Sequence, residues 1–105
     1  MTRLVVDELN TLLDKRGSRF LYAGQLRDAA RSMPDNIREG YGRRKGPDRM
    51  RFLIMARGSA EEADEQLRAN FAANRLPAVV YWRLHHRFSV IVKMLTSLID
   101  RDDPD

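Results

Sequence analysis

Three groups of residues in this sequence have side chains that could do chemistry: two histidines, a run of carboxylates and a cluster of cations. His85 and His86 are adjacent, so on a helix their side chains would point about 100° apart. Two rings in that arrangement cannot easily bind one ion. We therefore expect a structural or surface role for both histidines.

The carboxylates are Glu61, Glu62, Asp64 and Glu65. Glu61 and Glu65 would share one helix face, but no histidine stands at the partner spacing found in di-iron helix bundles. We expect this run to form a solvated face, or one that meets the arginines of a neighbouring subunit, rather than a metal site.

The sequence contains no recognisable catalytic set. It has no cysteine, which excludes a thiolate nucleophile, a disulfide and a cysteine-based zinc site. A nucleophile elbow, a Walker loop and a dinucleotide fingerprint are all missing. Ser32 and Ser59 have no evident histidine partner. We expect a protein that is not an enzyme, with no cofactor and no bound metal.

The cations are concentrated in one short window. The 105 residues include 19 Lys and Arg against 15 Asp and Glu, a formal charge of +4. Residues 38–51 carry six cations and two carboxylates, a net charge equal to that of the whole chain. Arginine predominates, and its guanidinium matches phosphate in a two-pronged geometry.

We predict that this window binds RNA, DNA or another polyanion, with Tyr41 stacking on a base. The candidate contact residues are Arg38, Tyr41, Arg43, Arg44, Lys45, Arg49 and Arg51. The alternative is a solvated turn whose cations satisfy the last carbonyls of the preceding helix.

Hydrophobic spacing of three and four residues runs through almost the whole chain and predicts helices. The expected helices cover residues 2–14, 19–40, 47–73 and 77–100, and no strand signal interrupts them. Short connections predict an all-α, antiparallel up-down four-helix bundle. We assign residues 1–101 to a single domain and expect the acidic residues 102–105 to fray.

Several positions carry finer predictions. Ser18 could cap the second helix, and Pro34 should kink that helix without breaking it. Phe52 should begin the core-facing stripe of the third helix. Gly58, in the middle of that helix, should mark the close approach of a neighbouring helix.

The fourth helix has an apolar arc of about 200°, roughly twice what a core-facing stripe needs. The surplus predicts a homo-oligomer, unless the helix is simply central in its own bundle. The expected interface residues are Tyr81, Phe88, Val90, Val92 and Met94. No run of about 20 apolar residues and no leader-like start is present, so we expect a cytoplasmic protein that does not contact a membrane.

Two motifs resemble a known family. Residues 32–40 read Ser-Met-Pro-Asp-Asn-Ile-Arg-Glu-Gly, and Phe52-Leu53, Ala56, Gly58-Ser59 and Glu62 follow. This order and spacing resembles the four-helix-bundle proteins first known as 23S rRNA intervening-sequence proteins. The first helix is shorter than is usual in that family, and the family's Pro-x-x-Glu before the second helix is missing.

The resemblance implies a left-handed bundle that assembles as a homopentamer. Some relatives are encoded within intervening sequences of ribosomal RNA genes. A structurally similar branch comprises the accessory variability proteins of diversity-generating retroelements, which bind a reverse transcriptase and nucleic acid during mutagenic cDNA synthesis. Our first expectation is a non-catalytic accessory protein of this second kind. The alternatives are an intervening-sequence RNA-binding protein and a scaffold that docks an acidic protein partner.

Overall fold

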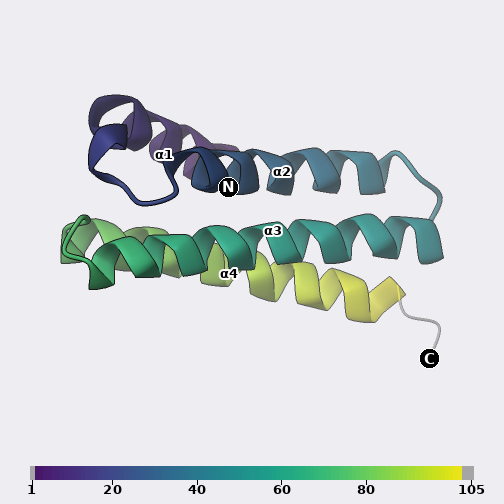
Figure 1. Ribbon diagram of the computed structural model, residues 1–105. Coiled ribbons are helices and arrows are strands. Elements are labelled where there is room, and N and C mark those ends of the chain that lie inside the picture. The colour runs from purple at the N-terminus through teal and green to yellow at the C-terminus, as the bar shows by residue number, and fades with distance from the viewer. Residues whose placement is uncertain (1, 103–105) are drawn as a thin grey trace.

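The computed structural model describes residues 2–102 and contains four α-helices joined by short connections (Figure 1). They are α1 (Thr2–Arg16), α2 (Ala23–Tyr41), α3 (Pro47–Ala72) and α4 (Ala78–Asp102), with a short 3-10 helix, η1 (Gly17–Arg19), after α1. No strand occurs in the described part, so the all-α prediction is confirmed. Asp102 ends α4, and the rest of the predicted acidic tail lies outside the described residues.

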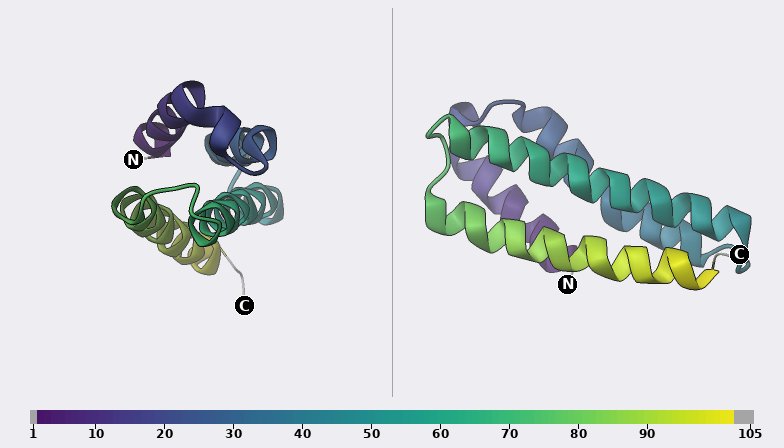
Figure 2. Two further views of the ribbon diagram at one scale, coloured as in Figure 1. Left: turned by 60° about the vertical axis from the view of Figure 1, so that its left-hand side comes forward. Right: turned by 90° about the horizontal axis from the view of Figure 1, so that it is seen from below.

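The bundle is a rod with principal extents of 44 × 19 × 19 Å. Its chain reverses direction at each connection, which places the α2–α3 turn at one end and the α1–α2 and α3–α4 connections at the other (Figures 1 and 2). At a rise of about 1.5 Å per residue, the 15 residues of α1 span only about half of this rod. The half that contains the α2–α3 turn is therefore built from α2, α3 and α4.

The core runs along the axis of the rod and holds one stripe from each helix. α2 and α3 form the most extensive helix pair. Small residues make this possible, because Ala30 in α2 and Ala56 and Ala60 in α3 are fully buried and let the backbones approach. Larger side chains from α1 and α4, such as Leu9 and Phe88, fill the space beside them.

The second helix begins at Ala23, four residues later than predicted. The reason is a contact distant in sequence. The buried side chain of Asn70 in α3 accepts a hydrogen bond from the backbone N–H of Leu21 (2.7 Å) and donates one to the Leu21 carbonyl (3.1 Å). Tyr22 then adopts a left-handed conformation and opens α2 without a side-chain cap. The cap predicted at Ser18 is wrong, because Ser18 lies in η1.

Two predictions about helix interiors have opposite outcomes. α2 continues through Pro34 as one helix, which confirms that the proline does not split it. The close approach predicted at Gly58 is wrong, because a Cβ there would meet no atom within 4 Å. Gly40 occupies such a position instead. A Cβ on Gly40 would lie 3.2 Å from the Phe52 Cβ and 3.4 Å from the Arg49 carbonyl oxygen.

The predicted oligomer face of α4 is only partly on the surface. Phe88 is 0% exposed and Tyr81 is 4% exposed, because both side chains fill the core of this chain. We therefore correct their assignment from interface to core. Val90 and Val92 are partly buried, and Met94 is 43% exposed. Within residues 2–102, no helix combines the length and hydropathy needed to cross a membrane.

Candidate nucleic-acid interface

The basic window spans the end of α2, the turn, and the start of α3. Gly42 ends α2, and its N–H donates back to the Arg38 carbonyl (3.1 Å). Gly46 has a φ of 142°, a backbone conformation that favours glycine, and Pro47 opens α3 as its first residue. These residues fix a sharp reversal, so the cations on both sides of the turn gather at one end of the rod.

Arg49 braces this turn from inside. Its Nη2 donates to the Arg43 carbonyl (2.8 Å), and its Nε lies 3.3 Å from the Gly40 carbonyl oxygen. The guanidinium also lies over the Tyr41 ring, 5.0 Å from the centroid. Arg49 was predicted to contact a ligand. In the structure its hydrogen bonds go to the backbone of the turn, so its main role is to position the turn. It satisfies carbonyls near the end of α2, as the alternative interpretation of the window expects.

Arg43 and Arg51 lie around Phe52. Their guanidinium carbons are 5.1 and 5.0 Å from the ring centroid, and both side chains reach Asp48 at 3.5 Å. Arg43 also pairs with Glu39 at 2.9 Å. Phe52 lies partly buried beneath these two arginines at the surface, and the predicted core position of Phe52 is wrong, because Leu53 is the fully buried residue at the start of the α3 stripe.

Arg44 and Lys45 lie at the outer end of the turn. Both side chains are exposed, and within the described part of the chain the Arg44 guanidinium has no ion pair or hydrogen bond. Arg38, in the last turn of α2, makes a long 3.4 Å ion pair with Asp35, and both side chains are well exposed. Such surface pairs contribute little and can exchange for a phosphate.

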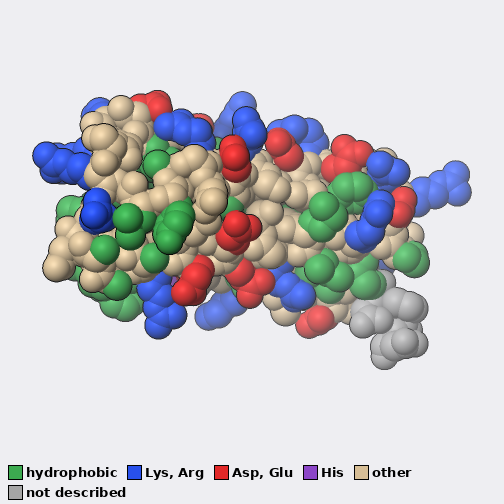
Figure 3. Space-filling model, viewed as in Figure 1, with side chains coloured by type: hydrophobic (Ala, Val, Ile, Leu, Met, Phe, Trp, Pro, Cys, Tyr) green, Lys and Arg blue, Asp and Glu red, His purple; other side chains and the backbone are tan. Residues whose placement is uncertain are grey.

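Tyr41 completes the predicted set. Its ring is 47% exposed beside the Arg49 guanidinium, so it keeps open surface on which a base could stack. All seven predicted residues therefore lie at one end of the rod. In Figure 3, Lys and Arg side chains lie along the whole rod, and at this end one of them extends well beyond the rest of the surface.

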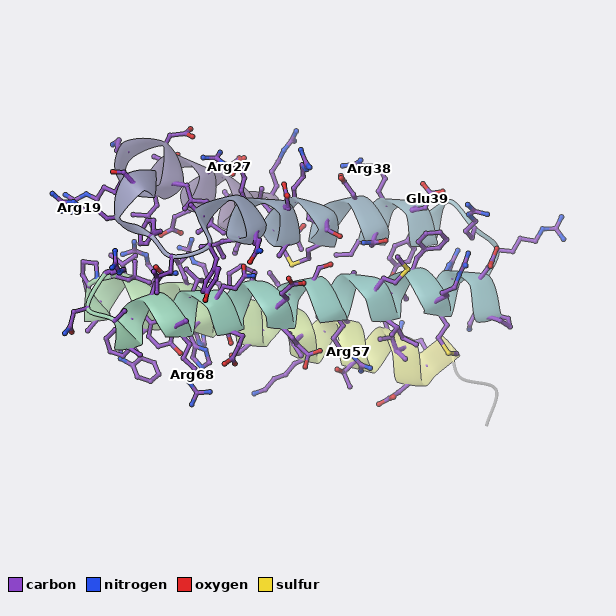
Figure 4. The ribbon with its side chains drawn as sticks, in the orientation of Figure 1. Arg19, Arg27, Arg38, Glu39, Arg57 and Arg68 are labelled. Carbon is purple, nitrogen blue, oxygen red and sulfur yellow. The ribbon has the colours of Figure 1, made fainter. Side chains whose placement is uncertain are left out.

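Not all of the positive charge of the turn is available to a ligand, because several of its cations are paired with carboxylates. Glu39 and Asp48 are both engaged with Arg43, and Asp48 also with Arg51. Among residues 2–102, no carboxylate pairs with Arg44 at the tip of the turn or with Arg49, which braces the turn. In Figure 4, Arg38 and Glu39 lie in the half of α2 that leads to the turn, whereas Arg19 and Arg68 lie toward the opposite end of the rod.

The two sequence motifs meet in the α2–α3 packing rather than at the turn surface. Ser59 Oγ donates to Ser32 Oγ (3.0 Å), and Asn36 Nδ2 donates to the Ser32 side chain and carbonyl (both 2.9 Å). The Ser59–Ser32 bond joins α3 to α2, and the Asn36 bonds hold Ser32 in place within α2. Ser32 and Ser59, one residue from each motif, thus take part in helix pairing, a role that spacing alone did not reveal.

The other candidate chemistry is structural as well. His85 Nδ1 contacts both Asp64 carboxylate oxygens at 3.0 Å, which links α4 to the carboxylate run of α3. Tyr81 stacks on Phe71 beneath this pair, and burial, followed by the charge of Asp64, raises its pKa. Within residues 2–102, no three His, Cys, Asp or Glu side chains are grouped closely enough to hold a metal ion.

The fold and the site define a class: a small four-helix bundle that presents an arginine-rich turn at one end. The sequence matches the 23S rRNA-intervening sequence protein family over residues 2–97. This chain therefore belongs to that family. No curated protein matches the chain.

A solved structure gives the same fold. The crystal structure of a protein of unknown function from the S23 ribosomal protein family of Bacteroides thetaiotaomicron has a TM-score of 0.80 to this chain. The alignment covers 93% of this chain and 90% of that one, at 21% identity. At this identity the similarity concerns the fold alone.

Proposed function

We propose that this protein is a non-catalytic RNA-binding protein whose arginine-rich turn contacts the phosphate backbone. The carrying observation is the exposed guanidinium of Arg44, which has no partner among the described residues and stands at the tip of a turn that Arg49 braces with two hydrogen bonds. Because Arg49 holds the backbone on either side of Arg44, binding has to order mainly the side chains of the turn rather than its backbone. The neighbouring Tyr41 ring supplies a surface on which an unpaired base could stack.

RNA is preferred to the retroelement function that the sequence first suggested. The family to which the chain belongs takes its name from 23S rRNA intervening sequences, and this supports an RNA ligand. Nothing in the turn is specific to a reverse transcriptase. The alternative is a scaffold that uses the same cations to dock an acidic protein. The two functions are distinguished by whether the turn binds RNA or an acidic protein.

We further propose that the protein acts as a homo-oligomer. α1 covers only part of the rod, and apolar side chains remain exposed on the outer faces of α3 and α4, among them Ile54, Met55 and Met94. A second copy would cover such surface. Assembly would also repeat the turn, and several linked weak contacts would strengthen binding to one RNA.

The test measures binding of a fluorescent single-stranded RNA at several salt concentrations. Each phosphate contact adds about 0.7 to the slope of log affinity against log salt for single strands. Substituting both Arg44→Ala and Lys45→Ala should weaken binding severalfold and lower the slope by about 1.4. An unchanged slope and affinity would refute the assignment of the turn.

The matched control removes two exposed cations elsewhere. Arg68 in α3 and Lys93 in α4 are both exposed. The double variant Arg68→Ala, Lys93→Ala loses two positive charges, as the turn variant does, so the two variants have the same net charge. We expect it to bind RNA nearly as well as the native chain. Equal weakening by both variants would indicate a diffuse charge effect rather than a site.

A further inference from the structure

The end of the bundle opposite the basic turn contains an open cavity of about 930 Å³. It lies between the chain that links α1 to α2 and the connection from α3 to α4. Its size falls within the range typical of small-molecule sites. Neither the proposed RNA contact nor the two sequence motifs involve this cavity.

The floor of the cavity is apolar. Phe20 and Leu76 are buried members of the core, and Leu12, Phe71 and Val80 are partly buried against it. These five side chains form a continuous hydrophobic surface between α1, α3 and α4. A ligand with an apolar body would remove this surface from water, and the gain grows with the area covered.

The rim is cationic. Arg16, Arg19 and Arg75 line the cavity, and the described residues that line it include no Asp or Glu. Arg75 Nη1 donates to the Arg19 carbonyl (3.1 Å), which joins the two segments that form the mouth. Figure 4 shows Arg19 extended into solvent at this end.

These arginines differ from most others in the protein. On the flank of α1, Arg27 pairs with Asp14 at 2.8 Å, and Arg83 pairs with Glu8 at 2.7 Å. Within the described residues, by contrast, the guanidinium groups of Arg16, Arg19 and Arg75 have no carboxylate partner. A cluster of guanidinium groups without carboxylates repels itself and favours an anion.

We propose that this cavity binds an amphipathic anion, a molecule with one acidic headgroup on an apolar body of about the size of a medium-chain fatty acid. The apolar body would lie on Phe20, Leu76 and their neighbours, and the flexible side chains of Arg16 and Arg19 would close on the headgroup. A nucleic-acid strand fits this site less well, because its floor is apolar and its cations surround a single mouth.

The test compares two fluorescent probes that differ mainly in charge. Anilinonaphthalene sulfonate carries an anionic group, whereas phenylnaphthylamine is its neutral counterpart. We expect saturable binding of the sulfonate to the folded native chain, at least tenfold tighter than binding of the neutral dye, because charge-assisted hydrogen bonds to guanidinium are strong. Decanoate should displace the sulfonate dye, and decanol should not.

A variant localises the binding to the rim. The double substitution Arg16→Gln, Arg19→Gln keeps the side chains long and removes their charge, and we expect it to weaken sulfonate binding about tenfold. The matched control is Arg31→Gln in α2 together with Arg68→Gln in α3, which removes two exposed charges outside both the cavity and the basic turn. It should bind the dye like the native chain. Circular dichroism melts verify that each variant is folded.

Three results would overturn the proposal: no saturable binding, equal binding of the charged and neutral dyes, or equal weakening by the rim and control variants. Because the cavity and the basic turn lie at opposite ends of the rod, RNA binding should be unaffected by the rim variant. Failure of this proposal therefore leaves the RNA proposal standing, and the reverse also holds.

Discussion

Two glycines in α2 and α3 have opposite surroundings, although both stand in helices. A Cβ on Gly40 would press on the Phe52 Cβ and the Arg49 carbonyl, which belong to the facing helix and cannot easily move. Gly58 is exposed and faces open space. From the sequence alone we expected the close approach at Gly58, because a glycine in the middle of a helix is more unusual than one near a helix end.

We predict that Gly40→Ala destabilises the protein by about 1–3 kcal/mol through overpacking. Gly58→Ala should stabilise it by up to about 1 kcal/mol, because alanine has the higher helix propensity and meets no clash. Urea denaturation of the two variants measures both free energies of unfolding. Destabilisation by Gly58→Ala, or no effect of Gly40→Ala, would contradict this description of the helix pair.

Asn70 is the clearest example of a residue that sequence analysis missed. It is fully buried and binds the backbone of Leu21, 49 positions away, as well as the Gln66 carbonyl (2.8 Å). In a sequence, an asparagine near the end of a helix indicates a helix cap or a turn. Its actual partner is a loop that only the folded chain brings close.

We predict that Asn70→Ala costs about 2–4 kcal/mol, because it leaves two backbone groups of Leu21 without their partners and creates a cavity. Amide hydrogen exchange near Leu21 should become much faster. The control is Asn10→Ala, which removes a longer and more exposed contact to Arg27 (3.3 Å) and should cost little. Equal costs for the two variants would be evidence against the Asn70 anchor.

At the scale of elements, the sequence predicted which segments are helical and roughly where they end. Hydrophobic spacing identified all four, and Pro47 correctly located the start of α3. The gathering of cations at the α2–α3 turn also followed from the sequence. What could not be predicted were the tertiary contacts: the brace by Arg49, the cover over Phe52, and the cavity at the opposite end.

The turn is the element on which the proposed function depends, and Arg49 holds it. We predict that Arg49→Ala lowers the free energy of unfolding by about 1–2 kcal/mol, since two backbone carbonyls lose their donor. It should also accelerate hydrogen exchange of the turn amides. Arg38→Ala, which breaks only an exposed pair, should change stability by less than about 0.5 kcal/mol.

At the scale of the whole molecule, the rod has unequal halves and exposed apolar side chains. We predict that light scattering gives a native mass that is a multiple of the 12.2 kDa chain. Met94→Lys should shift the mass toward the monomer, because it places a charge on apolar surface that we expect a second copy to cover. A native mass near 12 kDa would contradict the assembly and leave the RNA site on a single copy.

The two ends of the rod have different chemistry. One presents a cationic turn with an exposed aromatic ring, and the other presents a cavity with an apolar floor and three arginines that have no carboxylate partner among the described residues. This separation allows the two proposed ligands to bind at the same time. It also means that a probe of one end reports nothing about the other.

The most direct test of the RNA proposal is ultraviolet crosslinking of the native protein to a single-stranded RNA, followed by mass spectrometry of the crosslinked peptides. The predicted result is crosslinking within residues 38–51, with Tyr41 among the modified residues, and its loss at high salt. Crosslinks concentrated elsewhere, for example at the exposed ring of Trp82 in α4, would contradict the assignment of the turn.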